Sequence, residues 1–107
     1  MIEQILCAAI WYKEIPIKKN IEHYARPINI ECGLVFCGFR HCHCIYTMCA
    51  VTGLRSVENA EDGVGEEVQG FLTNKNRFVD REEAAKIAFD AGQINEELNR
   101  LHSEDLY

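Results

Sequence analysis

Two arginines in the second half of the chain have the type and spacing to bind an anion. Arg77 and Arg81 lie four residues apart, on either side of Asp80, which is a good N-cap for a helix. The first N–H groups of a helix have no partner within it and form the positive end of its dipole. A phosphate there would also meet guanidinium groups, which can each bind it through two hydrogen bonds. The alternative is that both arginines form ordinary surface ion pairs with Asp80 or Glu82.

Aromatic and amide side chains near these arginines are suited to the rest of a nucleotide. Phe71 and Phe78 offer rings on which a purine could stack, and Asn74 and Asn76 offer hydrogen-bonding amides. Each ring taken alone is more typical of core packing. The clustering of the rings and amides with the arginines favours a phosphate-bearing small molecule as the ligand.

A second segment, residues 37–49, is rich in side chains that bind metals. It contains Cys37, Arg40, His41, Cys42, His43, Cys44 and Cys49. Structural zinc sites usually consist of two ligand pairs separated by a longer stretch, whereas these candidates fall within one segment. A small zinc- or protein-binding module that uses this segment is therefore the alternative function. We expect neither a metal site nor a cofactor.

The same segment contains a possible nucleophile and base. Cys44 and His41 are three residues apart, a spacing at which the two side chains can meet on a helix. The sequence around them shows no oxyanion motif and no acid that would orient the histidine. We therefore expect a binding protein and not an enzyme.

The pattern of apolar residues predicts the elements that carry these side chains. Apolar runs predict strands over residues 2–12, 28–37 and 68–73, although the length of the first run leaves a helix open. Helical spacing predicts a helix over residues 41–51 and a second helix that begins after Asp80 and ends at Gly92.

Residues 13–29 contain two prolines and indicate an irregular excursion between the first two strands. We expect a single domain over residues 1–107, of the α+β class, with a small, largely antiparallel sheet and two main helices.

Composition limits the kind of partner. The chain has 17 Asp and Glu residues against 11 Lys and Arg, for a net charge of -6, which argues against duplex nucleic acid. No apolar run is long enough to cross a bilayer, and the N-terminus lacks the pattern of a signal peptide. We expect a cytoplasmic protein whose six cysteines are thiols and not disulfides.

Four short motifs resemble a known family. They are Gly38-Phe-Arg-His, Gln69-Gly-Phe-Leu-Thr, Arg77-Phe-Val-Asp-Arg-Glu-Glu-Ala and Ala91-Gly-Gln-Ile. Together they resemble the small bacteriophage proteins that counter bacterial Thoeris defence, specifically the first-described type of these sponges. Members sequester a cyclic ADP-ribose messenger without cleaving it, and some also hold cyclic trinucleotides. The resemblance covers residues 38–107.

The resemblance implies roles for individual residues of this chain. It makes Arg77 and Arg81 phosphate ligands, Phe71 or Phe78 a base-stacking residue, and Arg40 and His41 further polar contacts. With Asn76, these residues form the expected ligand site. The resemblance also implies an α+β protein that forms dimers and hexamers in the cytoplasm of the host bacterium.

Apolar residues in the C-terminal tail give a separate reason to expect self-association. Leu98, Leu101, Leu106 and Tyr107 have no obvious partner within the chain. A small single core is marginally stable, and a second copy would bury these side chains. We therefore expect a dimer or a higher oligomer.

Overall fold

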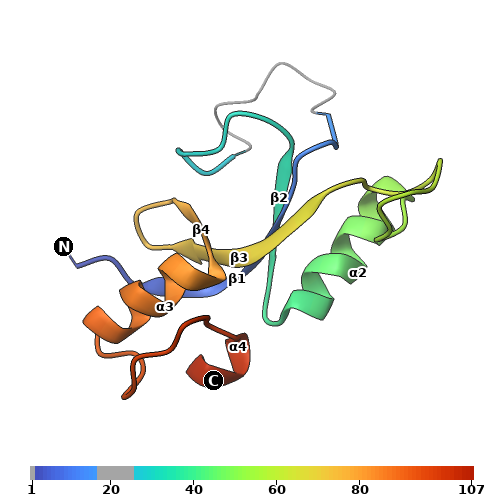
Figure 1. Ribbon diagram of the computed structural model, residues 1–107. Coiled ribbons are helices and arrows are strands. Elements are labelled where there is room, and N and C mark those ends of the chain that lie inside the picture. Colours follow the sequence, from blue (N-terminus) through green and yellow to red (C-terminus); the bar gives the residue numbers. More distant parts are fainter. Residues whose placement is uncertain (1, 17–25) are drawn as a thin grey trace.

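The described part of the chain, residues 2–16 and 26–107 of a computed structural model, contains a four-stranded antiparallel sheet with helices on one face (Figure 1). The strands are β1 (Ile5–Tyr12), β2 (Leu34–Gly38), β3 (Glu67–Thr73) and β4 (Phe78–Asp80), in the order β2-β1-β3-β4. The helices are α2 (His41–Thr52), α3 (Arg81–Asp90) and the short α4 (Ser103–Leu106). The expected α+β class, antiparallel sheet and two main helices are confirmed.

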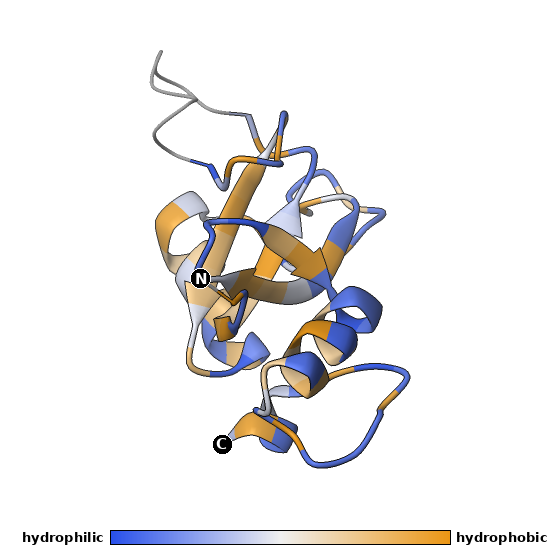
Figure 2. Ribbon diagram, turned by 90° about the vertical axis from the view of Figure 1, so that its left-hand side faces the viewer, coloured by the Kyte–Doolittle hydropathy of each residue, from blue (hydrophilic) through white to orange (hydrophobic). Residues whose placement is uncertain are grey.

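The two faces of the sheet bury different sets of apolar side chains. Because successive strand residues point to opposite faces, Phe71 and its neighbour Val79 lie on the face that α2 and α3 cover. Leu72 and Phe78 lie on the other face, where they pack with Ile30 of the 26–33 segment. The apolar colour of the strands is visible in Figure 2. The two phenylalanines of the expected ligand site are thus on opposite sides of the sheet.

The second strand is shorter than its sequence pattern predicts. The expected strand covered residues 28–37, but β2 begins only at Leu34. The preceding residues form a segment that crosses the second face of the sheet, held there by the side-chain amide of Asn29. Its Nδ2 donates to the carbonyl of Phe78 at 2.7 Å, and its Oδ1 accepts the N–H of Phe78 at 2.9 Å. The alternation of apolar and polar residues around Ile30 therefore arises because this segment packs on the face of the sheet, and not because it is a strand of the sheet.

Other element boundaries differ less. β1 begins at Ile5 and not at residue 2, and it is a strand throughout. β4 was not expected, because its three residues are hidden in what reads as a polar turn followed by a helix cap. Of the predicted excursion over residues 13–29, residues 17–25 lie outside the described part of the chain.

The two main helices follow their predicted ends closely. α2 covers His41–Thr52 and is followed by Gly53, whose positive φ of 73° suits a helix end. At the start of α3, the carboxylate of Asp80 accepts the N–H of Glu83 at 2.8 Å, so the predicted N-cap is confirmed. The reciprocal half of the capping box is absent, because Glu83 binds Arg77 instead. Gly92, with a φ of 75°, lies just beyond the C-cap Ala91.

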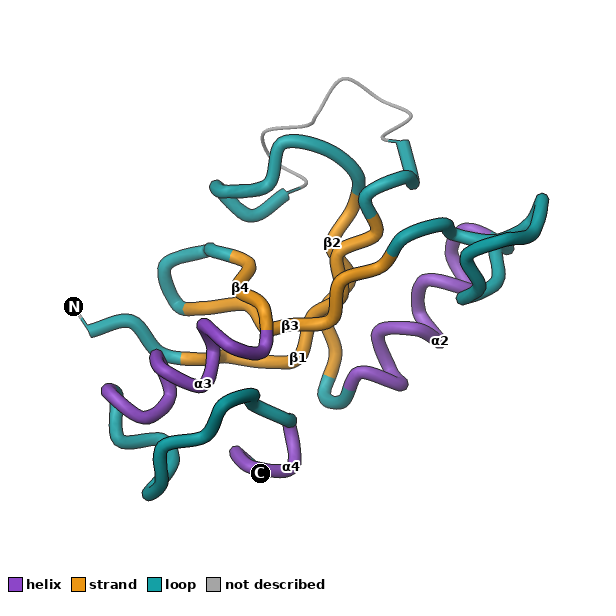
Figure 3. Tube along the Cα trace, viewed as in Figure 1, coloured by secondary structure: helices purple, strands orange, loops and turns teal. Residues whose placement is uncertain are grey.

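The C-terminal tail packs within its own chain. Leu101 is fully buried, and Leu98 and Leu106 pack against the same core as the helices. The expectation that these leucines lack an intrachain partner is therefore wrong, and they give no reason for self-association. The tail runs beside α3 and ends at α4 (Figure 3). Among the described residues, no helix combines the length and apolar character needed to cross a membrane.

Candidate anion-binding site

Arg77 is held by two carboxylates. Its guanidinium donates to both oxygens of Glu3 at 2.9 Å each, and Nη2 also donates to Glu83 at 3.0 Å. Hydrogen bonds from Arg77 and Thr73, against the opposing effect of burial, lower the pKa of Glu3 to about 2. Arg77 therefore joins three elements, namely the N-terminal segment, the β3–β4 hairpin and α3. Its charge is neutralised within the fold.

Arg81, four residues further on and the first residue of α3, has a different set of partners. Its guanidinium donates to the carbonyl of Leu101 at 2.8 Å and to the side-chain carbonyl of Gln69 at 2.7 Å. A longer contact of 3.4 Å joins Nη2 to Nδ1 of His41. All three acceptors are neutral, and within the described residues no carboxylate forms a salt bridge with Arg81. Burial, followed by the nearby charge of Arg100, lowers the pKa of Arg81, while the carboxylates of Glu104 and Asp105, which do not bond it, act in the opposite direction.

Backbone pairing brings these groups together. β3 and β4 pair Gly70 with Asp80, which places Gln69 beside the first residue of α3. The tail then closes over Arg81, whose backbone carbonyl accepts the N–H of Leu101 at 2.9 Å. Arg81 is thus fixed from both ends, by its backbone and by its guanidinium.

His41 orients Arg81 from the side of α2. Its Nε2 lies 2.8 Å from the carbonyl oxygen of Gly70, which can only accept, so Nε2 carries the proton and Nδ1 faces Arg81 as an acceptor. The imidazole also packs edge-on against the ring of Phe71, with 5.1 Å between centroids. Burial lowers the pKa of His41, and the charge of Arg81 acts in the same direction. His41 is therefore a neutral acceptor here.

Gly70 allows this close arrangement. A Cβ atom at this position would lie 2.0 Å from the carbonyl oxygen of Val79, far below a van der Waals contact. Only glycine lets β4 approach β3 closely enough here to start α3 with Arg81 beside Gln69.

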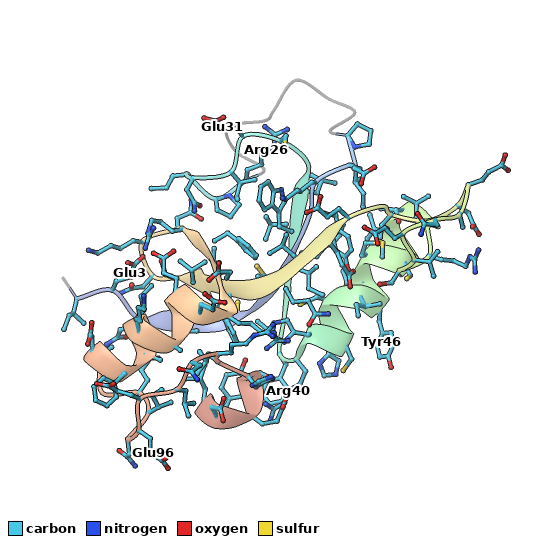
Figure 4. All side chains as sticks on the ribbon, in the orientation of Figure 1. Glu3, Arg26, Glu31, Arg40, Tyr46 and Glu96 are labelled. Carbon is cyan, nitrogen blue, oxygen red and sulfur yellow. The ribbon has the colours of Figure 1, made fainter. Side chains whose placement is uncertain are left out.

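Arg40, which precedes His41 in the chain, contacts the C-terminal segment instead of Arg81. It donates to the hydroxyl of Ser103 at 3.0 Å and to the backbone carbonyl of Tyr107. Its guanidinium also lies over the rings of Phe39 and Tyr107, at 4.8 and 4.9 Å from their centroids. Figure 4 shows Arg40 beside α4. This side chain anchors the last helix to the turn that precedes α2.

The remaining residues of the expected site are not placed for one common ligand. Phe71 is fully buried, and Phe78 is 5% exposed and packs edge-on against Trp11 on the opposite face of the sheet. Asn76 is exposed at the β3–β4 turn, where its φ is 56°. Arg77 faces Glu3, whereas Arg81 faces the tail. The structure brings together His41, Arg81 and the buried edge of Phe71, and it separates them from Asn76, Arg77 and Phe78.

An open hollow of about 490 Å³ lies over Arg81. Its lining includes Gln69 and Arg100 beside Arg81, together with the acidic residues Glu67, Asp80 and Glu82. A second hollow of about 670 Å³ continues from it between α3 and the tail and shares Glu82 and Arg100 with the first. Arg100 was missed by sequence analysis, since one exposed arginine in a polar tail carries no signal of its own.

One known protein family matches nearly the whole chain. Residues 4–107 match the family described as phage T4 y16D protein. The chain belongs to the phage T4 y16D protein family. No curated protein and no solved structure gives a match. The match runs from β1 through α4, so both arginine clusters of this phage protein lie within the family's shared region.

The Cys/His segment of this phage T4 y16D family member is dispersed in space. Cys37 and Cys42 are exposed, whereas Cys44 is buried and its thiol points to the backbone carbonyls of Ala8 and Arg40, at 3.6 and 3.5 Å. In residues 2–16 and 26–107, no three His, Cys, Asp or Glu side chains are grouped so that they could hold a metal ion.

Cys44 and His41 do not form a nucleophile–base pair in this structure. The imidazole bonds Gly70 and Arg81, and the thiol bonds backbone carbonyls, so each group is committed to other partners. Burial raises the pKa of Cys44 to about 12, which keeps the thiol protonated near neutral pH. What the arrangement around Arg81 can do is bind an anion through a fixed guanidinium.

Proposed function

We propose that this phage protein binds a phosphate-bearing nucleotide in the hollow over Arg81. We further propose that the ligand is a cyclic nucleotide immune messenger of the cyclic ADP-ribose class, sequestered without cleavage in the host cytoplasm so that anti-phage defence is inhibited. One observation carries the proposal. The guanidinium of Arg81 is partly buried, lines an open hollow and bonds only neutral acceptors.

The energetics of a buried charge support an anionic ligand. A charge removed from water is costly unless it is paired, which is why buried arginines usually contact carboxylates. Arg81 bonds no carboxylate among the described residues, and the second cation that lines the hollow, Arg100, opposes it. A phosphate in the hollow would neutralise both groups. The N-terminal end of α3 would add a favourable dipole interaction.

The acidic residues of the hollow do not all oppose an anion. The carboxylate of Asp80 is turned toward the N–H of Glu83, and that of Glu67 accepts from the hydroxyl of Ser56 at 3.0 Å. Glu82 is exposed at the junction of the two hollows. As an acceptor-only group it suits the hydroxyls of a ribose.

The adjoining hollow is suited to the rest of a nucleotide. Its lining includes the aromatic ring of Phe89, the amide of Asn99 and Leu98, together with charged side chains, namely Lys86, Asp90 and Glu97. A ring and an amide are the groups that bind a base by stacking and by hydrogen bonding to its edge. In this arrangement Phe89 takes the part that sequence analysis gave to Phe71 or Phe78.

Binding without turnover is part of the proposal. Two groups that could act as nucleophile and base, Cys44 and His41, are committed to other partners, and the thiol is protonated. A ligand held by Arg81 and Arg100 would therefore be bound without being attacked by this pair.

We also propose that two copies of the chain associate through α2. The sequence of this helix, HCHCIYTMCAVT, contains no Asp, Glu, Lys or Arg, and Tyr46 and Val51 on it are 67% and 70% exposed. Tyr46 points away from the sheet in Figure 4. Two chains with a net charge of -6 each repel one another, so an uncharged face is the one through which a second copy can approach most easily. Light scattering should report a dimer or larger assembly, and Tyr46→Glu should shift it toward a 12.3 kDa monomer.

The nucleotide proposal is tested by ligand recovery. The purified protein is incubated with each cyclic ADP-ribose isomer, separated from free ligand and heated, and the released material is analysed by chromatography. We expect the input molecule to be recovered intact in an amount that scales with the protein. Cyclic trinucleotides serve as a second ligand class in the same assay.

Two matched variants localise the binding. Arg100→Gln and Lys75→Gln each remove one exposed cation, but only Arg100 lines the hollow. We expect the first to release several-fold less ligand and the second to match the parent. Equal recovery from both would place the ligand elsewhere, and time-dependent loss of the input molecule would identify a catalyst.

A further inference from the structure

Two thiols meet at the edge of the sheet, away from the arginines. Cys7 of β1 and Cys37 of β2 lie on the same face, because β1 pairs Ala9 with Cys37 and Cys7 lies two residues before Ala9. The two side chains are therefore diagonal neighbours on adjacent strands. Both line one open hollow of about 490 Å³ together with Leu6, Phe39 and Tyr107. Cys37 is exposed and Cys7 is partly exposed, so a small reagent can reach the pair.

We propose that Cys7 and Cys37 are a redox modification site, at which hydrogen peroxide converts the two thiols into a disulfide between β1 and β2. The thiolate of Cys7 attacks one peroxide oxygen and the O–O bond breaks, which gives a sulfenic acid on Cys7 and releases hydroxide. The hydroxide takes up the proton that Cys7 lost to solvent on ionisation and becomes water. The sulfur of Cys37 then attacks the sulfur of Cys7. The S–S bond forms, the S–O bond breaks, and the proton of Cys37 leaves with the hydroxide as water. The two cysteines lose two electrons and the peroxide gains them.

The electrostatics of the pair favour Cys7 as the attacking group. The hydrogen bond from Cys37, helped by the backbone N–H of Gly38 and opposed by burial, lowers the pKa of Cys7 to about 7. The same contact raises the pKa of Cys37, which therefore stays a thiol and donates. Oxidation begins on a thiolate, and a thiol with a pKa near the ambient pH is the optimum nucleophile. Cys44 is buried, and burial raises its pKa so that it stays protonated near neutral pH.

The position of the pair connects it with the candidate anion site. β2 is an edge strand of the described sheet, and Gly38 at its end is followed directly by Phe39, Arg40 and His41. Diagonal neighbours on antiparallel strands are further apart than the Cβ atoms of a disulfide, so closing the bond draws this end of β2 toward β1. A covalent link here therefore acts on the turn that carries His41.

Disulfide mapping tests the proposal without any nucleotide, so its outcome is independent of the proposed binding function. The reduced protein is treated with a small molar excess of hydrogen peroxide, its remaining thiols are alkylated, and the digest is analysed without reduction. We expect a cross-linked pair of peptides containing Cys7 and Cys37, with Cys32 and Cys42, both exposed, still mostly alkylated. Oxidation of Cys32 or Cys42 at the same rate, or a disulfide between any other two cysteines, would overturn the proposal.

A variant pair checks the mechanism through the rate of Cys7 alkylation at pH 7. Cys37→Ala removes the group that lowers the pKa of Cys7, so less of Cys7 is thiolate at pH 7. The thiolate that remains is more nucleophilic, which offsets part of this loss, and we expect the rate to fall roughly threefold. Cys32→Ala removes an exposed thiol elsewhere and should leave the rate unchanged. An unchanged rate in Cys37→Ala would show that the two thiols do not interact, which contradicts the assigned pair.

Discussion

Arg77 and Arg81 are four residues apart and have the same side chain, yet they occupy opposite electrostatic environments. Arg77 bonds the carboxylates of Glu3 and Glu83, so its charge is already balanced within the fold. Arg81 bonds the carbonyls of Leu101 and Gln69, and among the described residues no carboxylate forms a salt bridge with it. We infer that an arginine of the first kind stabilises the fold, and we propose that an arginine of the second kind binds an anion.

The first prediction tests whether the ion pairs of Arg77 stabilise the fold. Arg77→Gln leaves Glu3, whose side chain is 16% exposed, without its charged partner. We expect the free energy of unfolding to fall by about 1–2 kcal/mol, because two charge-assisted hydrogen bonds to a mostly buried carboxylate are lost. Urea unfolding monitored by circular dichroism at pH 7 measures the change.

Arg55→Gln is the matched control for this variant. Arg55 also forms a fork with one carboxylate, Asp62, at 2.8 Å for both bonds, but the two side chains are 61% and 57% exposed. Exposed pairs contribute little, so this variant should unfold like the parent. An equal fall in the free energy of unfolding of the two variants would mean that Arg77 stabilises the fold no more than an exposed ion pair does.

The second prediction concerns how the stability that the Glu3–Arg77 ion pair contributes depends on pH. Since the pKa of Glu3 is lowered to about 2 in the fold from 4.5, its contribution to stability is complete above pH 4.5 and is lost as the pH falls toward 2. Glu3→Gln should therefore be less stable than the parent at pH 6 but should lose less stability between pH 4.5 and 2. Parallel curves for the two proteins over that range would contradict the assigned pair.

The third and smallest effect concerns the environment of Arg81. Because the pKa of His41 is lowered in the fold, the unfolded chain takes up a proton first as the pH falls below the usual value of 6.5. The contribution of His41 to stability is thus present at higher pH and is lost as the pH falls through its folded-state pKa. His41→Gln should flatten the stability curve below pH 6.5, whereas His102→Gln, at an exposed histidine, should not. Thermal unfolding at a series of pH values distinguishes them.

Local signals in the sequence were enough for the parts of the fold that depend on neighbours in the chain. Asp80, Glu83 and Gly92 fix the ends of α3 within a few residues. Apolar spacing also predicted the extent of α2, although the side chains that this helix buries are Cys44 and Met48, and Cys42 and Tyr46 of the same helix are exposed. β4 was not predicted because three residues are too few to show the alternation of a strand. The segment before β2 was misassigned because alternation also arises when a loop covers a sheet, as Ile30 does.

The candidate site depends on contacts between distant residues, which no spacing reveals. Glu3 and Arg77 are 74 positions apart, so the neutralisation of this arginine could not be read from the chain. The carbonyl of Leu101 holds Arg81 only because the tail folds back over α3, and the same fold buries the leucines that had suggested a dimer. The sequence patterns therefore gave equal roles to two arginines that have different partners in the structure.

Titration calorimetry on one matched pair tests the central claim most directly. The nucleotide recovered in the chromatographic assay is titrated into the parent, Arg81→Gln and Arg77→Gln, at a temperature where all three are folded by circular dichroism. A charge-assisted contact contributes about 1.5–3 kcal/mol, so Arg81→Gln should bind roughly ten- to a hundredfold more weakly, while Arg77→Gln should bind like the parent despite its lower stability. Weaker binding by Arg77→Gln, with Arg81→Gln unchanged, would contradict the account.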